Sequence, residues 1–172
     1  LKYRIKIKEI KNNFNTKYLN KDMLPVYDVK YKQKKPFQRI SSKSNRYIFK
    51  CFDIAINLAK NKKIIGFINC PVSKETLFKN KHQGITEFLS KKAGVIGSEV
   101  MLIYNKQLSV SPLTTHIPLY QVSNKINKSK IVKKIKIIYN FYKEIFNKKP
   151  NIAVLGLNPH NFSSKKRSEE KE

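Results

Sequence analysis

The amino-acid sequence predicts an α/β protein in which a mostly parallel sheet lies between layers of helices. Short apolar runs, at 64–69 and 151–157, have the length of buried strands. They alternate with amphipathic stretches of ten or more residues, as at 45–60 and 129–147. A strand that is apolar on both faces is typical of a parallel sheet with helices on each side. No internal repeat is visible.

The N-terminal part is expected to begin with a strand. Residues 3–9 alternate between polar and apolar side chains, which indicates a strand with one solvent-exposed face. Residues 11–40 are polar and irregular, with one short strand near "LPVYDV". Ser41 and Ser42 are candidate caps for a helix in "NRYIFKCFDIAINLAK". Its buried face is predicted to carry Ile48, Cys51, Phe52, Ala55, Leu58 and Ala59.

The middle of the chain should contain a strand and two short helices. "KKIIGFIN", residues 62–69, reads as a fully buried strand that ends at Cys70 and Pro71. The segments "SKETLFKN" and "TEFLSKKA" are predicted helices, and Gly94 can close the second of them.

The C-terminal part is predicted to hold three strands and a long helix. Two strands, "SEVMLIY" and "LSVSPLT", are joined by a turn at Asn105 and Lys106. A helix near 129–147 follows, and Pro150 opens the last strand, "NIAVLGL". The buried stripe of the helix is predicted to carry Ile131, Ile135, Ile138, Phe141 and Ile145.

The net charge is +26, from 37 Lys and Arg against 11 Asp and Glu. Such a charge is compatible with a polyanion- or nucleic-acid-binding module, an alternative that a steep fall of DNA binding with salt would support. However, lysines are spread along the chain beside abundant Asn, Ile, Phe and Tyr, as codon drift in an AT-rich genome would produce. A binding module more often concentrates Arg and exposed aromatic residues. We therefore expect no nucleic-acid partner.

Two cysteines, Cys51 and Cys70, are expected to be free thiols in a reducing compartment. No apolar run is long enough to span a bilayer, so no membrane partner is expected and a cytoplasmic location is predicted.

Candidate functional residues follow the predicted strands, because ligands of open α/β sheets bind beyond the carboxyl ends of the strands. These segments are "CPVSK", "TTHIPL" and "LNPH". His116 and His160 lie in the last two, each near a stiffening proline. Two such imidazoles suit a divalent metal, although two loop histidines bonded to carbonyls are an alternative explanation. The remaining histidine, His82, is expected to be exposed to solvent.

Other site signals are weak. The five glycines do not form a G-x-G-x-x-G fingerprint, and no P-loop or G-x-S-x-G is present. Lys74 could contact an anionic substrate, but a solvated lysine is the commoner explanation.

Four segments carry a resemblance to a known family: "INCPVSKETL", "GITEFL", "VMLIYNKQLSVSPLTTHIPL" and "VLGLNPHN". In this order they resemble the 4-hydroxythreonine-4-phosphate dehydrogenases of vitamin B6 synthesis, from about residue 45 to 161. The resemblance implies an α/β/α fold of the isocitrate and isopropylmalate dehydrogenase type, and a homodimer.

The same resemblance assigns roles to three residues. His116 and His160 match histidines that are metal ligands in the family; the family's third ligand lies in a Y-H-D-Q-G segment that this chain lacks. Thr86 matches a substrate-binding threonine of a G-H-T-E motif. Ile85 replaces the histidine of that motif and cannot donate its hydrogen bond, which is worth roughly 1.5–3 kcal/mol to a charged group.

The implied function is NAD-dependent oxidation of 4-phosphohydroxy-threonine, assisted by zinc, magnesium or cobalt. The product is a 3-keto acid that decarboxylates, on the route to pyridoxal phosphate. Because of Ile85, a related dehydrogenase of a four-carbon sugar-acid phosphate is an alternative. Either substrate is a small phosphorylated molecule.

Relative to this family the chain is expected to be an internal fragment, a partial dehydrogenase fold over 1–172. Within it, 1–40 would be a strand and irregular segment, 41–160 the alternating α/β part and 161–172 a truncated tail. Such a fragment is expected to bind metal weakly, to be inactive alone and to be marginally stable.

Overall fold

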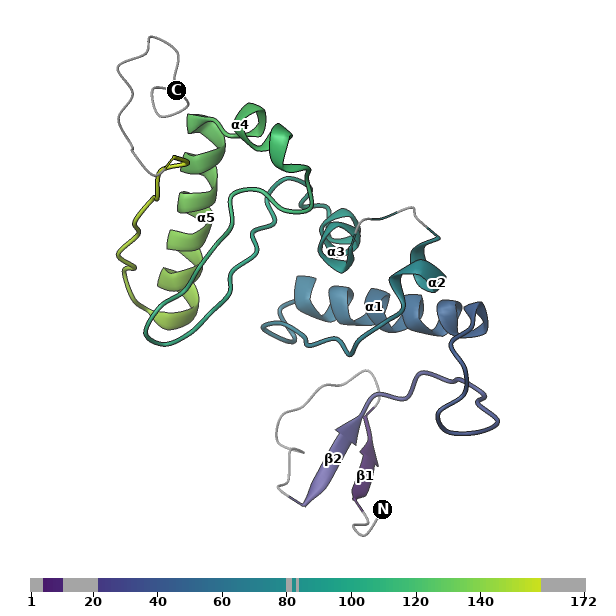
Figure 1. Ribbon diagram of the computed structural model, residues 1–172. Helices are drawn as coiled ribbons and strands as arrows, with labels where there is room; N and C mark the ends of the chain where they lie inside the picture. The colour runs from purple at the N-terminus through teal and green to yellow at the C-terminus, as the bar shows by residue number, and fades with distance from the viewer. Residues whose placement is uncertain (1–4, 11–21, 80–81, 83, 159–172) are drawn as a thin grey trace, which may run out of the picture. The chain divides into compact units, whose positions relative to one another are not determined.

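Helices and a small parallel sheet make up the part of the chain that the computed structural model describes, residues 5–10, 22–79, 82 and 84–158 (Figure 1). The chain divides into two units, residues 1–93 and 94–172. The predicted mixed α/β class is confirmed at this level. None of the helices in the described ranges is both long and apolar enough to cross a membrane.

The sheet of unit 1 has two parallel strands. Strand β1, Lys6–Glu9, pairs with β2, Met23–Val26, so that Lys6 lies opposite Met23 and Glu9 opposite Val26. The amide of Ile10 extends the ladder by donating to the carbonyl of Val26 at 2.8 Å. Both strands were predicted from alternation and β-forming side chains, and both are confirmed.

Helix α1, Asn45–Lys60, follows a 3₁₀ turn, η2, at Ser42–Ser44. The predicted helix is confirmed, and its apolar face buries Phe52 and Ile56. The predicted capping by Ser41 or Ser42 is wrong. The N-cap residue is Ser44, whose hydroxyl donates to the carbonyl of Ser41 at 3.1 Å and caps no helical amide.

Two shorter helices, α2 (Lys74–Phe78) and α3 (Ile85–Ala93), complete unit 1. Both were predicted, and Gly94 follows α3 in the left-handed conformation at a φ of +76°, which suits glycine. The core of unit 1 is an aromatic cluster that joins α1, α2 and α3. Its buried members are Phe52, Leu77, Phe78 and Phe88.

The predicted buried strand at 62–69 is wrong. Residues 66–69 form no regular structure, and the side chains of Ile65 and Ile68 are fully exposed. Apolar β-branched residues favour a strand, but a strand forms only where a neighbour accepts its backbone hydrogen bonds. No described segment pairs with 62–69, so the apolar run stays uncovered.

Unit 2 begins with a hairpin whose two sides exchange one pair of backbone hydrogen bonds. Ile103 and Val110 donate to each other's carbonyls at 2.8 and 2.9 Å. The side chain of Asn105 accepts from the amide of Gln107 at 2.9 Å, which closes the predicted turn. The turn is confirmed, whereas the two predicted strands are reduced to this single bridge.

A 3₁₀ turn, η3 (Leu119–Gln121), and a short helix, α4 (Val122–Lys125), lead to the long helix α5, Lys128–Phe146. The helix begins at Asn127, whose side chain accepts from the amide of Lys130, and ends at Asn147 in the left-handed conformation. The helix is confirmed, but its apolar stripe is not fully buried: Phe141 and Ile145 are 41% and 50% exposed.

The returning side of the hairpin, residues 109–113, is here named the first arm, and it runs antiparallel to α5. Tyr142 donates from its hydroxyl to that of Ser109 at 2.8 Å. The ammonium of Lys134 donates to the carbonyls of Pro112 and Leu113 at 3.0 and 2.9 Å. Eight helical residues rise about 12 Å, and four extended residues span about 13 Å. The two polar contacts are therefore spaced to suit an extended arm.

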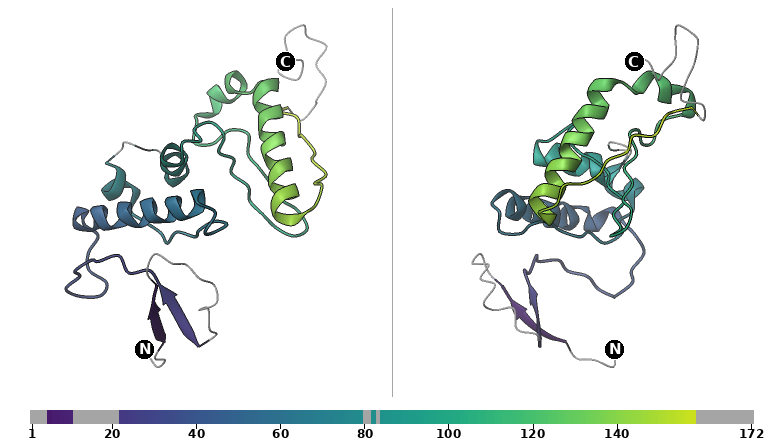
Figure 2. Two further views of the ribbon diagram at one scale, coloured as in Figure 1. Left: turned by 180° about the vertical axis from the view of Figure 1, so that it is seen from behind. Right: turned by 90° about the vertical axis from the view of Figure 1, so that its left-hand side faces the viewer.

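Residues 151–157, the second arm, also run back along α5 towards its N-terminal end (Figures 1 and 2). First arm, helix and second arm thus trace the path of a β-α-β unit. The predicted strand at 151–157 is nevertheless wrong as a hydrogen-bonded element, because no described strand pairs with it. Val154 and Leu155 are exposed for the same reason.

Candidate functional site

The segment "CPVSK" leads into α2, as predicted. The Ser73 hydroxyl caps this helix by accepting from the amide of Thr76 at 3.3 Å. Asn45 of α1 donates from its side chain to the carbonyl of Thr76 at 2.8 Å and so ties the two helices together. Lys74, the first residue of α2, is exposed. Its position leaves it accessible to an anion, and the suggested contact with substrate stays a prediction.

Thr86 lies in the first turn of α3 and is exposed, while Ile85 beside it packs against the aromatic cluster. Ile85 is therefore half-buried and supports the core. The carboxylate of Glu87 folds back over Gly84, where a Cβ atom would lie 2.7 Å from Oε2. That oxygen is buried and has no hydrogen-bond partner among the described residues. Thr86 is exposed, and its role in binding substrate stays a prediction.

His82 contradicts the expectation that it is exposed. It is half-buried, and its ring packs edge-on against Phe78 and Phe88 with centroids 5.4 and 5.5 Å apart. His82 therefore packs as part of the aromatic cluster, since an imidazole edge fits the face of a phenyl ring. The lysines near it in the sequence, Lys79 and Lys81, carry no information about this contact.

His116 lies at the turn that follows the first arm. Its imidazole is exposed and its backbone is left-handed, with a φ of +55°. A side chain other than glycine pays roughly 1–2 kcal/mol for this conformation. Left-handed residues of this kind cluster at functional sites, where surrounding structure holds them in place. The turn therefore presents His116 to solvent at an energetic cost, as a ligand would require.

This cost leads to a prediction. Replacing His116 with glycine should raise the free energy of unfolding of unit 2 by up to about 1 kcal/mol, because glycine adopts a positive φ without strain. The same variant should lose whatever zinc affinity the imidazole provides. Urea denaturation and zinc titration measure the two effects.

The matched control is Lys62→Gly, at an exposed residue with a φ of +54°. It should gain similar stability and leave zinc affinity unchanged. Loss of stability in His116→Gly would contradict the idea that the imidazole is held against backbone preference.

The two arms of unit 2 both end near the N-terminal end of α5, because both run opposite to the helix. His116 follows the first arm. His160 lies outside the described residues, two positions after Asn158. Among residues 5–10, 22–79, 82 and 84–158, no three His, Cys, Asp or Glu side chains are grouped to hold a metal. The role of His116 as a metal ligand therefore stays a prediction.

Thr86 and His116 belong to different units, so their predicted convergence with "CPVSK" and His160 on one rim of the sheet stays a prediction.

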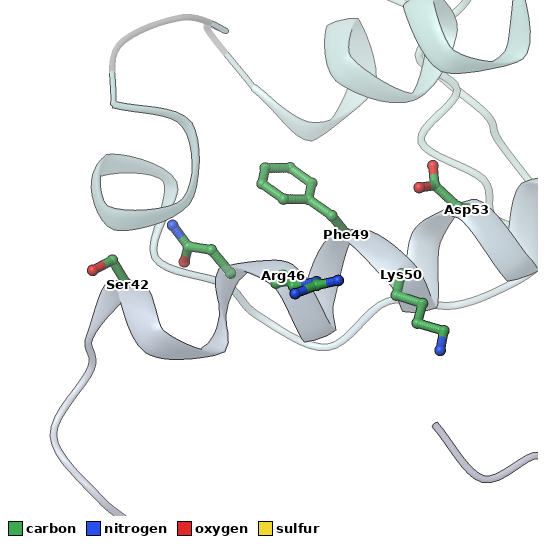
Figure 3. A pocket seen from close by; sticks show the side chains of 6 residues that line it. Ser42, Arg46, Phe49, Lys50 and Asp53 are labelled. Atoms are coloured by element: carbon green, nitrogen blue, oxygen red, sulfur yellow. The ribbon is translucent and has the colours of Figure 1, made fainter. Parts of the chain in front are cut away.

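An open hollow beside α1 was not predicted from the sequence. Figure 3 shows that Phe49 and Asp53 project from one side of the helix, while Arg46 lies across its front and Lys50 points to the opposite side. The hollow has a volume of about 610 Å³ and is lined by Ser42, Asn45, Arg46, Phe49, Lys50 and Asp53. Asp53 pairs with Lys92 of α3 at 2.8 Å. None of the predicted site residues lines the hollow, and periodicity alone gave no signal for it.

Two groups among the described residues have displaced pKa values. Burial lowers the pKa of Lys134, and the negative charge of Glu99 partly opposes this shift. Burial raises the pKa of Tyr47, and the neighbouring Cys51 and Asp28 act in the same direction. Tyr47 also stacks on Tyr31, with ring centroids 4.8 Å apart. Lys134 is the one of the two that contacts the first arm.

Comparison with known proteins gives one family match over nearly the whole chain. The model of the family described as "Pyridoxal phosphate biosynthetic protein PdxA" matches residues 1–171. A 4-hydroxythreonine-4-phosphate dehydrogenase of Sulfurihydrogenibium sp. is 31% identical over 159 residues, which are 91% of this chain and 48% of that protein. The enzyme of the same name from Aquifex aeolicus is 41% identical over 99 residues, 56% of this chain and 31% of that protein.

A third relative has a different name. A protein of Bradyrhizobium diazoefficiens, provisionally named D-threonate 4-phosphate dehydrogenase, is 29% identical over 123 residues, 70% of this chain and 35% of that protein. The chain spans about half the length of the first relative and about a third of the length of the other two.

Proposed function

The chain belongs to the PdxA family of pyridoxal phosphate biosynthetic proteins, and from this premise we propose that it forms part of a 4-hydroxythreonine-4-phosphate dehydrogenase. The observation that supports the proposal is that, in the sequence, His116 follows the first arm of unit 2 and His160 follows the second arm. Both arms run opposite to α5 and so end near its N-terminal end. This path fits the parallel sheet of an isocitrate dehydrogenase-like fold.

His116 and His160 are proposed to hold a divalent metal: zinc, magnesium or cobalt. When bound, such an ion supplies Lewis-acid polarisation of the substrate hydroxyl. His116 contributes an exposed imidazole on the turn that follows the first arm. The hydrogen bond of Lys134 to Leu113 holds the end of that arm. Imidazole nitrogen is a preferred ligand of zinc and cobalt. The chemistry of the donor therefore suits the proposed role.

Thr86 is proposed to bind the phosphorylated substrate. Its hydroxyl is exposed at the first turn of α3, where the unpaired amides of a helix N-terminus favour negative charge. NAD is proposed to accept the hydride when the C3 hydroxyl of the substrate becomes a ketone. The 3-keto acid then loses CO₂, because the resulting carbanion is delocalised. We also propose that the protein forms a homodimer and is located in the cytoplasm.

A second candidate is a dehydrogenase of a four-carbon sugar-acid phosphate. The specific observation is Ile85, which occupies the place of the family's substrate-binding histidine and packs against the aromatic cluster. An isoleucine there cannot bond to a polar group that distinguishes the amino acid substrate. The relative from Bradyrhizobium diazoefficiens, provisionally named D-threonate 4-phosphate dehydrogenase, makes this substrate class the natural comparison.

Substrate-dependent NADH formation tests both candidates. The longest reading frame that contains these 172 residues should be assayed with 4-phosphohydroxy-threonine and with D-threonate 4-phosphate. Turnover of the amino acid supports the first candidate and turnover of the sugar acid supports the second. Turnover of neither substrate, in a folded protein loaded with metal, would contradict both.

The substitution Ile85→His should shift the balance between the two substrates. We expect the kcat/KM ratio to move towards 4-phosphohydroxy-threonine by about tenfold, which corresponds to one hydrogen bond to a charged group. We also expect a loss of about 1 kcal/mol in stability, because a polar ring replaces an apolar contact of the core. The matched control is Ile85→Val, which keeps the apolar contact and should leave the ratio unchanged. An unchanged kcat/KM ratio in Ile85→His would show that residue 85 does not decide between the two substrates.

A further inference from the structure

Two residues of α5, Lys134 and Tyr142, bond to the first arm, and the contact of Lys134 lies nearer to His116. Its ammonium donates to two successive carbonyls, those of Pro112 and Leu113, at 3.0 and 2.9 Å. The next residues of the chain are Thr114, Thr115 and His116. Two hydrogen bonds to adjacent peptide groups fix both the position of the first arm along α5 and its rotation about its own axis. A single hydrogen bond would leave the arm free to rotate.

The side chain of Lys134 is partly buried, and burial lowers the pKa of its ammonium, while the charge of Glu99 acts in the opposite direction. Oε2 of Glu99 is itself buried without a hydrogen-bond partner among the described residues. A partly buried charge with two carbonyl partners and a nearby carboxylate costs free energy to separate from them. The Lys134 clamp is therefore a stiff contact, in contrast to the many solvated lysines of this chain.

The second contact between α5 and the first arm lies at the other end. Tyr142 binds Ser109 at 2.8 Å, next to the turn of the hairpin. Tyr104 on the outgoing side stacks on Phe146, with ring centroids 5.0 Å apart. This end of the arm is held by a hydroxyl bond and aromatic contacts, and it lies seven residues before His116. The two ends can thus be perturbed separately.

We propose that Lys134 is a positioning residue that fixes the His116 turn for ligand binding through the carbonyls of Pro112 and Leu113. The proposal rests on the proposed role of His116 as a metal ligand and extends it to a residue outside the family motifs. His116 holds a left-handed backbone, so the direction from which the chain enters the turn decides where the imidazole points. Lys134 sets that direction from a rigid helix.

The experiment compares Lys134→Met with Tyr142→Phe in the longest reading frame that contains this chain. Methionine keeps most of the apolar stem but removes all donors, and phenylalanine removes only the hydroxyl. Both variants should lower the melting temperature. Only Lys134→Met should weaken zinc binding, by about tenfold, which is the lower end of the effect of groups that orient metal ligands. Lys136→Met, at an exposed lysine of the same helix, should change neither quantity.

Two further readouts distinguish positioning from general stability. Lys134→Arg should recover part of the zinc affinity, because a guanidinium can also donate to two carbonyls. In the metal-free protein, Lys134→Met should lower the backbone NMR order parameters of 114–117, whereas Tyr142→Phe should lower those of 105–110. Equal losses of zinc affinity in Lys134→Met and Tyr142→Phe, or lower order parameters over the whole unit, would overturn the proposal.

Failure of the proposed function gives a different pattern. If His116→Ala leaves zinc affinity unchanged, the metal role of His116 is wrong and the positioning proposal falls with it. If His116→Ala loses zinc affinity while Lys134→Met retains both zinc affinity and the backbone order parameters of 114–117, only the role of Lys134 is overturned.

Discussion

Replacing Phe88 with alanine is expected to unfold the helical part of unit 1. Phe88 is 4% exposed, and its ring contacts Phe49, Phe52, Phe78 and His82 at centroid distances of 5.2 to 5.5 Å. Truncating a buried phenylalanine costs about 3–5 kcal/mol. The core has so few fully buried members in the described residues that this loss is comparable with the whole stability of a small domain.

Circular dichroism and urea denaturation of the purified chain measure the effect. The control is Phe67→Ala in the same unit, where the ring is 37% exposed and its centroid lies 6.5 Å from that of Phe52. The control should cost about 1 kcal/mol or less. If Phe88→Ala loses no more stability than Phe67→Ala, the aromatic cluster does not form the core of unit 1.

Replacing either His116 or His160 with alanine is expected to lower metal affinity by more than about 100-fold. Loss of a direct ligand should exceed the 10–100-fold loss typical of groups that only orient ligands. Dehydrogenase turnover of the longest reading frame should fall with metal occupancy. Zinc titration, together with the absorption spectrum of the cobalt-loaded protein, separates loss of binding from loss of turnover.

His82→Ala is the matched control. His82 packs edge-on between two phenylalanines, so its removal should cost about 1 kcal/mol of stability and leave metal affinity unchanged. Loss of metal affinity in His82→Ala, with none in His160→Ala, would show that the metal ligands have been assigned to the wrong histidines.

The helices could be predicted from the sequence because their signals are local. Helical spacing of apolar residues placed α1 and α5 within a residue or two of their ends, and Gly94 ends α3 as its neighbours suggested. Asn105 likewise marked the hairpin turn, since its side chain bonds to the backbone two residues on. In each case the partner of the interaction lies within a few residues.

Two of the strands predicted from composition did not form. The runs 62–69 and 151–157 have the composition of buried strands, yet neither pairs with a described strand. Composition reports the preference of a segment, whereas a strand needs a neighbour whose position depends on the rest of the fold. The pairing of β1 with β2 shows the converse, because two short strands formed where each supplied the other's hydrogen bonds.

The sequence by itself determined the helices, the family and the residues proposed for metal and substrate, because these depend on local spacing and on short motifs. Only the tertiary structure decided that His82 packs in a core, that Ile85 supports that core, and that Lys134 clamps the first arm. The physical reason is that each of these roles comes from a contact with another element. Leu113 and Lys134 are 21 positions apart in the sequence, and the intervening segment carries no periodic signal that links a lysine to the carbonyls to which it donates.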